Sequence, residues 1–171
     1  MTTFALVTTL VSLVILGGFT AYSVWRFGWR GSYSSYAAKW AEAVPLESNT
    51  NVWSIVTIVA AILICFALLE RGEGDPLQFL GFFSPLYLAV VAFTPKYEEK
   101  RKQRIIHISG AVLCAAVSLV WLIAIRNAWW AILITAIGAL AAAYFTGTIK
   151  KSYIFWLEMA MFGAVYAAVI I

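Results

Sequence analysis

Long apolar runs, separated by short charged or turn-forming segments, dominate the pattern of this chain. Six such runs cover residues 3–25, 52–69, 79–94, 105–125, 128–147 and 153–171. A helix needs about 20 apolar residues to cross the hydrocarbon core of a bilayer, so each run predicts a transmembrane helix. The third run is the shortest and contains Pro85. The pattern therefore predicts an all-α fold, a polytopic transmembrane helix bundle of six spans, with five spans as the main alternative.

Composition supports a membrane location for the whole chain. Of its 171 residues, 63% are hydrophobic and 12% are charged, whereas soluble domains carry about 25% charged residues. The loops between the apolar runs are too short for a separate soluble domain, so residues 1–171 are expected to form one integral membrane domain. The first run has no basic residue before Arg26, so we expect it to be a retained span and no cleaved signal peptide.

Basic residues are concentrated in alternate loops of the predicted bundle. Ten of the 12 lie in the first, third and fifth loops, and only Arg71 and Arg126 lie on the other side. Because cytoplasmic loops retain Lys and Arg, this bias predicts a protein of the bacterial inner membrane with both termini outside. Topology alone accounts for the net charge of +4, so no nucleic-acid partner is expected.

The third loop is also a candidate contact for anionic lipid headgroups, which attract basic residues near the membrane surface. The candidate residues are Lys100, Arg101, Lys102 and Arg104. Ordinary anchoring by the same charges is the alternative reading.

The one sizeable loop, residues 26–51, shows helical periodicity of its own. Tyr33, Tyr36 and Trp40 recur at a spacing of three to four residues, and polar residues occupy the other face. This pattern predicts a short interfacial helix between spans one and two, whose aromatic face contacts lipid or the bundle. Such a helix either simply covers the bundle or serves as a gate or docking element for a partner.

Small residues form stripes on the last three predicted spans, and the fourth span carries Gly110, Cys114 and Ser118 at intervals of four. Close approach at small residues drives helix association in lipid. We therefore expect a tight bundle of the fourth, fifth and sixth spans, although alanine is also simply abundant in apolar helices.

One charged residue, Glu158, lies clearly within a span, and such residues are costly and often functional. His107 lies near the start of the fourth span, at a similar predicted depth and on the same face as Cys114 and Ser118. These four residues form the candidate intramembrane polar site, with His107 as the preferred partner of Glu158. The alternative is that both side chains reach water at the headgroup level.

Catalytic and cofactor motifs are absent from the sequence. It has no GxSxG, HExxH or phosphate-binding glycine motif, and two isolated cysteines with one histidine do not suggest a metal or haem site. We therefore expect no cofactor and, most simply, no enzyme. The favoured expectation is a membrane protein that binds or transports a small molecule, lipid or ion through a cavity near His107 and Glu158.

Two other classes of function stay open. A non-catalytic accessory protein would dock a partner through the helix in residues 26–51 and the basic loops, and an intramembrane lipid enzyme is the third class. Membrane lipids, a small-molecule or ion ligand, a second copy of the chain and a partner membrane protein are the expected binding partners.

Four segments carry a resemblance to a known group of proteins. They are Ala67–Glu70, Phe79–Phe83, Ala92–Lys100 and His107–Ala111. Together they resemble uncharacterised small multi-pass membrane proteins of gut-dwelling bacteria and their phages. The four segments lie within residues 67–111, about a quarter of the chain, and consist of apolar helix ends and a charged turn. The resemblance implies no activity.

Overall fold

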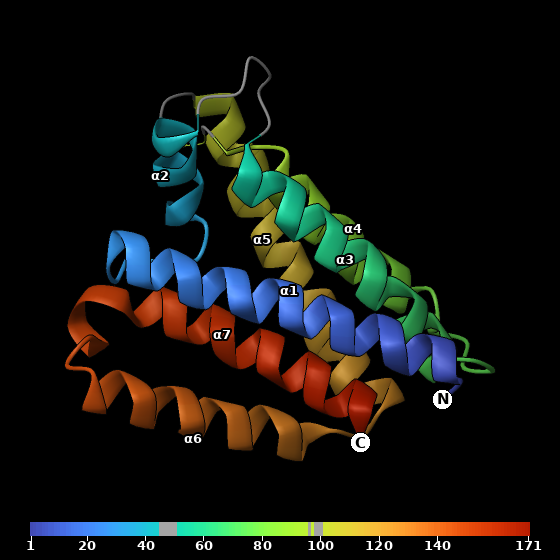
Figure 1. Ribbon diagram of the computed structural model, residues 1–171. Coiled ribbons are helices and arrows are strands. Elements are labelled where there is room, and N and C mark those ends of the chain that lie inside the picture. The colour runs from blue at the N-terminus through green and yellow to red at the C-terminus, as the bar shows by residue number, and fades with distance from the viewer. Residues whose placement is uncertain (45–50, 96, 98–100) are drawn as a thin grey trace.

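The structure is a computed structural model that describes residues 1–44, 51–95, 97 and 101–171, and its regular elements are helices (Figure 1). They are α1 (Thr3–Phe27), α2 (Ser35–Ala43), α3 (Val52–Arg71), α4 (Leu80–Ala92), α5 (Arg101–Val120), the π-helical turn η1 (Trp121–Ile125), α6 (Trp129–Phe145) and α7 (Ile149–Ile170). No strand occurs in the described residues. The predicted all-α class is confirmed.

Four helical segments are long and apolar enough to cross a membrane, namely α1, α3, α5 continued by η1, and α7. This confirms the membrane character that the composition predicts. Helices occupy all six predicted apolar runs, but α4 has 13 residues and α6 has 17, fewer than the about 20 of a typical span. The shorter helices pack against long neighbours, α4 against α3 and α5, and α6 against α7.

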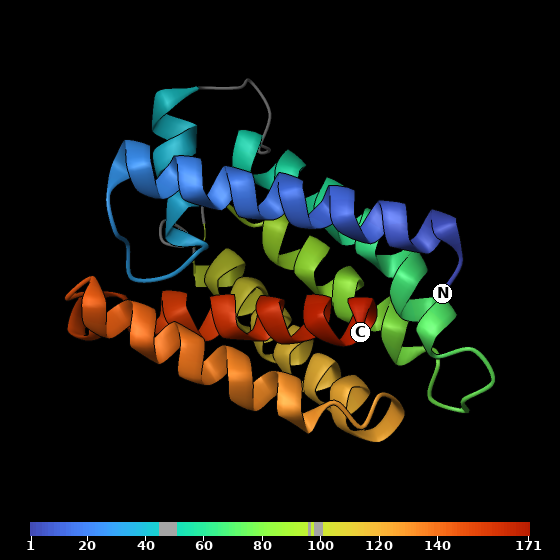
Figure 2. The ribbon, with the colours of Figure 1, turned by 60° about the horizontal axis from the view of Figure 1, so that its bottom comes forward.

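The helices of the six apolar runs, in the order α1, α3, α4, α5 with η1, α6 and α7, run alternately in opposite directions, so the chain passes back and forth between two ends of the bundle (Figures 1 and 2). Both termini lie at one end, together with the turns around residues 72–79 and 126–128. We call this the terminal end. The opposite end, called the loop end, holds α2, the end of α4, the start of α5 and the α6–α7 connection. In both views α2 crosses α1 steeply and lies near the start of α3.

Side chains of the terminal end bind the last carbonyls of α7. Arg71 Nε donates to the Val169 carbonyl at 2.8 Å, and Arg126 Nε donates to the Ala168 carbonyl at 3.1 Å. The last carbonyls of a helix have no partner within the helix, and basic side chains are favourable there. Burial, and then the positive charge of Arg71, lower the pKa of Arg126. The two arginines that stand apart from the basic loops are thus caps of α7.

Helices α3, α4 and α5 approach one another closely at glycines, which have no side chain. A Cβ on Gly81 of α4 would lie 2.9 Å from the Leu68 carbonyl carbon of α3, and a Cβ on Gly110 of α5 would lie 3.2 Å from Val91 of α4. The small-residue stripe of α5 therefore faces α4. α6 packs extensively against α7, but α5 has little direct contact with α7. The expected tight bundle of the fourth, fifth and sixth spans is therefore confirmed for the last two and wrong for α5.

Candidate functional site

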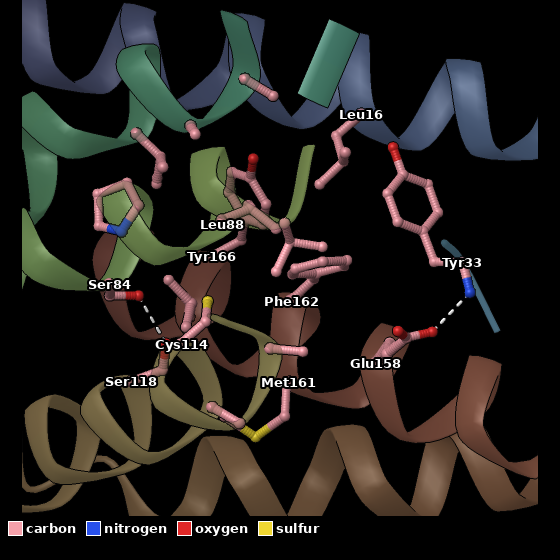
Figure 3. A pocket seen from close by; sticks show the side chains of 18 of the residues that line it. Leu16, Tyr33, Ser84, Leu88, Cys114, Ser118, Glu158, Met161, Phe162 and Tyr166 are labelled. Carbon is pink, nitrogen blue, oxygen red and sulfur yellow. Dashed lines mark hydrogen bonds between the residues drawn. The ribbon is translucent and has the colours of Figure 1, made fainter. Parts of the chain in front are cut away.

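A cavity of about 200 Å³ lies among α1, α3, α4, α5 and α7, and also borders the segment before α2. Alanine, leucine, isoleucine and valine side chains supply most of its wall (Figure 3). Glu158 is the one charged side chain among the described residues that line it. The cavity is therefore an apolar chamber with one charged side chain in its wall.

The α5 side of the cavity carries a neutral polar cluster. Ser84 Oγ of α4 lies 2.6 Å from Ser118 Oγ of α5, and Cys114 lies one turn from Ser118 on the same face (Figure 3). Pro85 follows Ser84 directly and has no N–H, so α4 lacks one backbone donor at this level. The two hydroxyls bind each other across the helix interface, and neither needs a ligand as its partner.

Glu158 lies toward the loop end of the cavity. Its Oε2 accepts a hydrogen bond from the Tyr33 backbone N–H at 2.5 Å (Figure 3). The described residues offer Glu158 no further hydrogen bond and no Lys, Arg or His nitrogen within ion-pair distance. One carboxylate oxygen is thus held by the backbone, while the other has no partner in the described chain.

A break in α7 brings the segment before α2 against Glu158. Ser152 has non-helical dihedral angles, φ −135° and ψ 30°, and Phe155 N–H donates to the Gly31 carbonyl at 3.0 Å in place of a helical partner. This bond and the Tyr33–Glu158 bond attach the segment to α7 at two points. The carboxylate is oriented by main chain from a different part of the sequence.

Tyr33 separates the cavity from the loop end. Its ring packs against Trp53 and Phe162, at centroid distances of 5.4 and 5.8 Å, and its hydroxyl lies 3.0 Å from Thr57 Oγ1. Burial raises the pKa of the Tyr33 hydroxyl above its usual range. The hydroxyl therefore stays neutral at physiological pH and remains a hydrogen-bond donor.

The aromatic face of α2 is buried in the bundle. Trp40 stacks on Phe19 at a centroid distance of 5.1 Å and donates from Nε1 to Ser23 Oγ at 2.9 Å. Tyr36 donates to the Gly28 carbonyl at 2.9 Å. A helix is thus present where the periodicity of residues 26–51 predicts one. Tyr33, just before α2, and Tyr36 and Trp40 of α2 have buried side chains that contact protein, and we call these three residues the aromatic plug.

The cavity reaches the molecular surface between α5 and α7. Leu157 in its wall is 63% exposed, and Ala115 and Met161 are partly exposed. α5 and α7 have little direct contact along this border, so the cavity opens between them. In a membrane, the border would face lipid chains.

His107 lies elsewhere in the bundle. It is buried, its Nδ1 lies 3.0 Å from Thr94 Oγ1, and its ring stacks on Tyr97 at a centroid distance of 4.0 Å. It is not among the residues that line the cavity, and no ion pair joins it to Glu158 in the described chain. Of the four residues of the candidate polar site, the cavity brings together Cys114, Ser118 and Glu158.

The candidate headgroup contacts lie at the loop end. Arg101, Lys102 and Arg104 are exposed on the first turn of α5, where they are accessible to lipid headgroups. Lys100 lies outside the described residues. Their contact with lipid stays a prediction.

Sequence reasoning missed Ser84 and the backbone donor of Tyr33. Ser84 precedes a proline in an apolar run, and this gives no signal of a partner. The Tyr33 donor is a backbone N–H, which no side-chain pattern reveals, although the periodicity of residues 26–51 did identify Tyr33 as a contact residue. Tyr166 also lines the cavity, but its hydroxyl is directed to Ser12 Oγ at 2.6 Å.

Comparison of the chain with protein-family models, curated proteins and solved structures found no match. The cavity and its charged residue therefore carry the functional argument.

Proposed function

We propose that this protein binds a small, predominantly apolar molecule in the cavity between α5 and α7, and that the molecule enters from the bilayer. The observation that carries this proposal is an apolar chamber of about 200 Å³ inside a helix bundle. Cavities on this scale in well-packed proteins are few, because interiors reach the density of organic crystals.

The volume limits the ligand to a small one. A dry apolar cavity of about 150 Å³ in another protein takes up benzene, and common ligand pockets begin at about 300 Å³. A chamber of about 200 Å³ thus suits one aromatic ring that carries a short aliphatic chain. The terminal part of a lipid chain has the same chemistry.

Entry from lipid follows from the position of the opening. The partly exposed wall residues lie along the border of α5 and α7, midway along two helices that are long enough to span a membrane. An apolar molecule dissolved in the bilayer reaches that border without crossing water. The aromatic plug fills the loop end and so closes the aqueous route.

Docking of a partner through the aromatic face of α2 receives less support. Tyr33, Tyr36 and Trp40 are each at most 7% exposed, so they offer no surface to a partner. The basic residues at the start of α5 are exposed, and they keep a lipid-contact role as a second proposal.

We also propose that all six apolar helices cross the bacterial inner membrane with both termini outside. The antiparallel course of the helices and the common end of the two termini support this topology. Ten of 12 basic residues would then lie on the cytoplasmic side. Cysteine labelling at residues near each terminus tests it, and labelling from opposite sides would contradict six crossings.

The binding proposal is tested by filling the cavity. The probe is 4-phenylbutan-1-ol, and its binding to protein in phosphatidylcholine nanodiscs is measured by saturation-transfer NMR with empty nanodiscs as the blank. We expect Ala115→Phe, in the cavity wall, to abolish binding. Ala141→Phe, which adds the same side chain at an exposed site on α6, should bind like the wild type. Equal binding by wild type and Ala115→Phe would contradict the proposal.

A further inference from the structure

The charge of Glu158 has no protein counter-ion within the described residues. Its Oε2 is held by the Tyr33 N–H at 2.5 Å, and no basic side chain of the described chain forms an ion pair with it. A carboxylate in a low-dielectric site normally requires a positive partner or several hydrogen-bond donors. Among the described residues Glu158 has one donor and no counter-ion, so a cationic ligand would supply the charge that these residues lack.

We infer that the ligand of the cavity is an amphiphilic amine, a molecule with a single ammonium group on a short apolar chain or ring. This inference rests on the proposed function and names the class of its ligand. The ammonium group would bind Glu158 through the oxygen that has no partner in the described chain, and the apolar part would fill the chamber.

The neighbours of Glu158 suit a cation. Phe162 lies one helical turn along α7, on the same face as Glu158, and its ring meets the Tyr33 ring edge-to-face at a centroid distance of 5.8 Å. In Figure 3 the Phe162 ring lies on the cavity side of Glu158, and the Tyr33 ring lies above it with its hydroxyl directed away from the carboxylate. Aromatic rings attract ammonium groups through their quadrupoles. The carboxylate of Glu158 and the aromatic rings therefore both favour a positively charged group on the ligand.

The rest of the cavity suits an uncharged tail. At the α5 side, Ser84 and Ser118 bind each other at 2.6 Å, and Tyr166 bonds to Ser12 outside the chamber. No second charged side chain lines the cavity in the described chain. A ligand with a second charged group would leave that group unpaired, so the preferred ligand carries one charge at one end.

A bare metal ion fits the site poorly. Hard cations take six or more oxygen ligands, and the described residues contain no group of three acidic, His or Cys side chains that could hold a metal. An ammonium group needs fewer partners and brings its own apolar tail, for which the chamber has room.

The test uses three probes with the same phenylbutyl tail: 4-phenylbutylamine, 4-phenylbutan-1-ol and 4-phenylbutyrate. Dissociation constants are measured at neutral pH in nanodiscs of zwitterionic phosphatidylcholine, with empty nanodiscs as the blank. We expect the wild type to bind the amine about 10- to 100-fold more tightly than the alcohol, as a hydrogen bond to a charged group allows. The carboxylate probe should bind most weakly. This comparison needs no variant.

Two variants assign the preference to Glu158. In Glu158→Gln the preference for the amine over the alcohol should disappear, so that the two probes bind equally. Glu73→Gln removes a charge from an exposed turn at the terminal end and should keep the full preference. Equal binding of amine and alcohol by the wild type would overturn the amine inference and leave the proposed function standing. A preference that survives Glu158→Gln would do the same. If no probe binds the wild type, the proposed function fails and the inference fails with it.

Discussion

The two ends of the bundle are held together by different kinds of contact. At the terminal end, individual hydrogen bonds from polar side chains join the elements. Arg71 donates to the Val169 carbonyl, and Thr2 Oγ1 donates to Glu70 at 2.6 Å. At the loop end, the aromatic plug fills the space between helices with buried rings. The terminal end depends on caps and on close backbone approach, whereas the loop end depends on side-chain volume.

This difference bears on the cavity. The plug contains Tyr33, whose backbone N–H orients Glu158 and whose ring borders the chamber. The segment that closes the loop end is thus also part of the candidate site. Changes at the loop end should affect both stability and binding, while changes at the terminal end should affect stability alone.

The largest expected effect is that of Trp40→Ala. It removes a buried ring that packs on Phe19 and Phe27, and should lower the free energy of unfolding by about 3–5 kcal/mol. Trp129→Ala is the matched control at the terminal end, because Trp129 is 60% exposed. Unfolding in mixed micelles, followed by circular dichroism, measures both. Equal losses for the two variants would remove the contrast between the ends.

Gly81→Ala tests close backbone approach near the terminal end. The new Cβ would lie 2.9 Å from the Leu68 carbonyl group, and overpacking of this kind costs about 1–3 kcal/mol. Gly138 of α6 has no atom within 4 Å of an added Cβ. Gly138→Ala should therefore be neutral, or stabilising by up to about 1 kcal/mol through helix propensity. A Gly81→Ala variant as stable as wild type would show that α3 and α4 are not in tight contact.

Arg71→Gln tests the cap on α7. Loss of the bonds to the Val169 and Ile170 carbonyls, at 2.8 and 3.3 Å, should cost about 1 kcal/mol, because partial exposure weakens charged contacts. Arg104→Gln, at an exposed site on α5, removes the same charge without a cap. Thermal melting of the two variants separates the cap from the charge, and identical melting temperatures would argue against the cap.

The smallest effect is expected for Tyr33→Phe, which keeps the ring and the backbone N–H. It removes the bond to Thr57, worth about 1 kcal/mol or less. Thr57→Val removes the same bond from the other side, and the two changes together should cost less than their sum. Amine binding should persist in Tyr33→Phe, since the donor to Glu158 is untouched. Full additivity in the double-mutant cycle would show that the hydroxyls do not interact.

The sequence predicted the helices well and their partners poorly. Apolar runs place α1, α3 and α7, because length and hydropathy are local properties. The periodicity of residues 26–51 likewise predicts α2. A small-residue stripe shows which face of α5 permits close approach, but the helix that occupies that face depends on the fold of the whole chain. The stripe therefore does not predict that α4, and not α6 or α7, packs against this face of α5.

The candidate site was predictable only in part. Glu158 stands out as a charge inside an apolar run. The hydrogen-bond partner of Glu158 could not be predicted in this way, because a backbone N–H at Tyr33 has no signature in the side-chain pattern. The break of α7 at Ser152 brings this N–H to Glu158. The similar predicted depths of His107 and Glu158 in the membrane favour His107 as its partner, yet in the structure His107 contacts Thr94 and Tyr97. Depth along parallel helices does not determine which faces meet.

The most direct test of the cavity proposal is a structure of the protein in nanodiscs with 4-phenylbutylamine present. The account predicts elongated density in the chamber between Glu158 and the Ser84–Ser118 pair, with the amine nitrogen within hydrogen-bond distance of the Glu158 carboxylate. A chamber filled by its own side chains, with Glu158 turned out to the headgroup region, would contradict it.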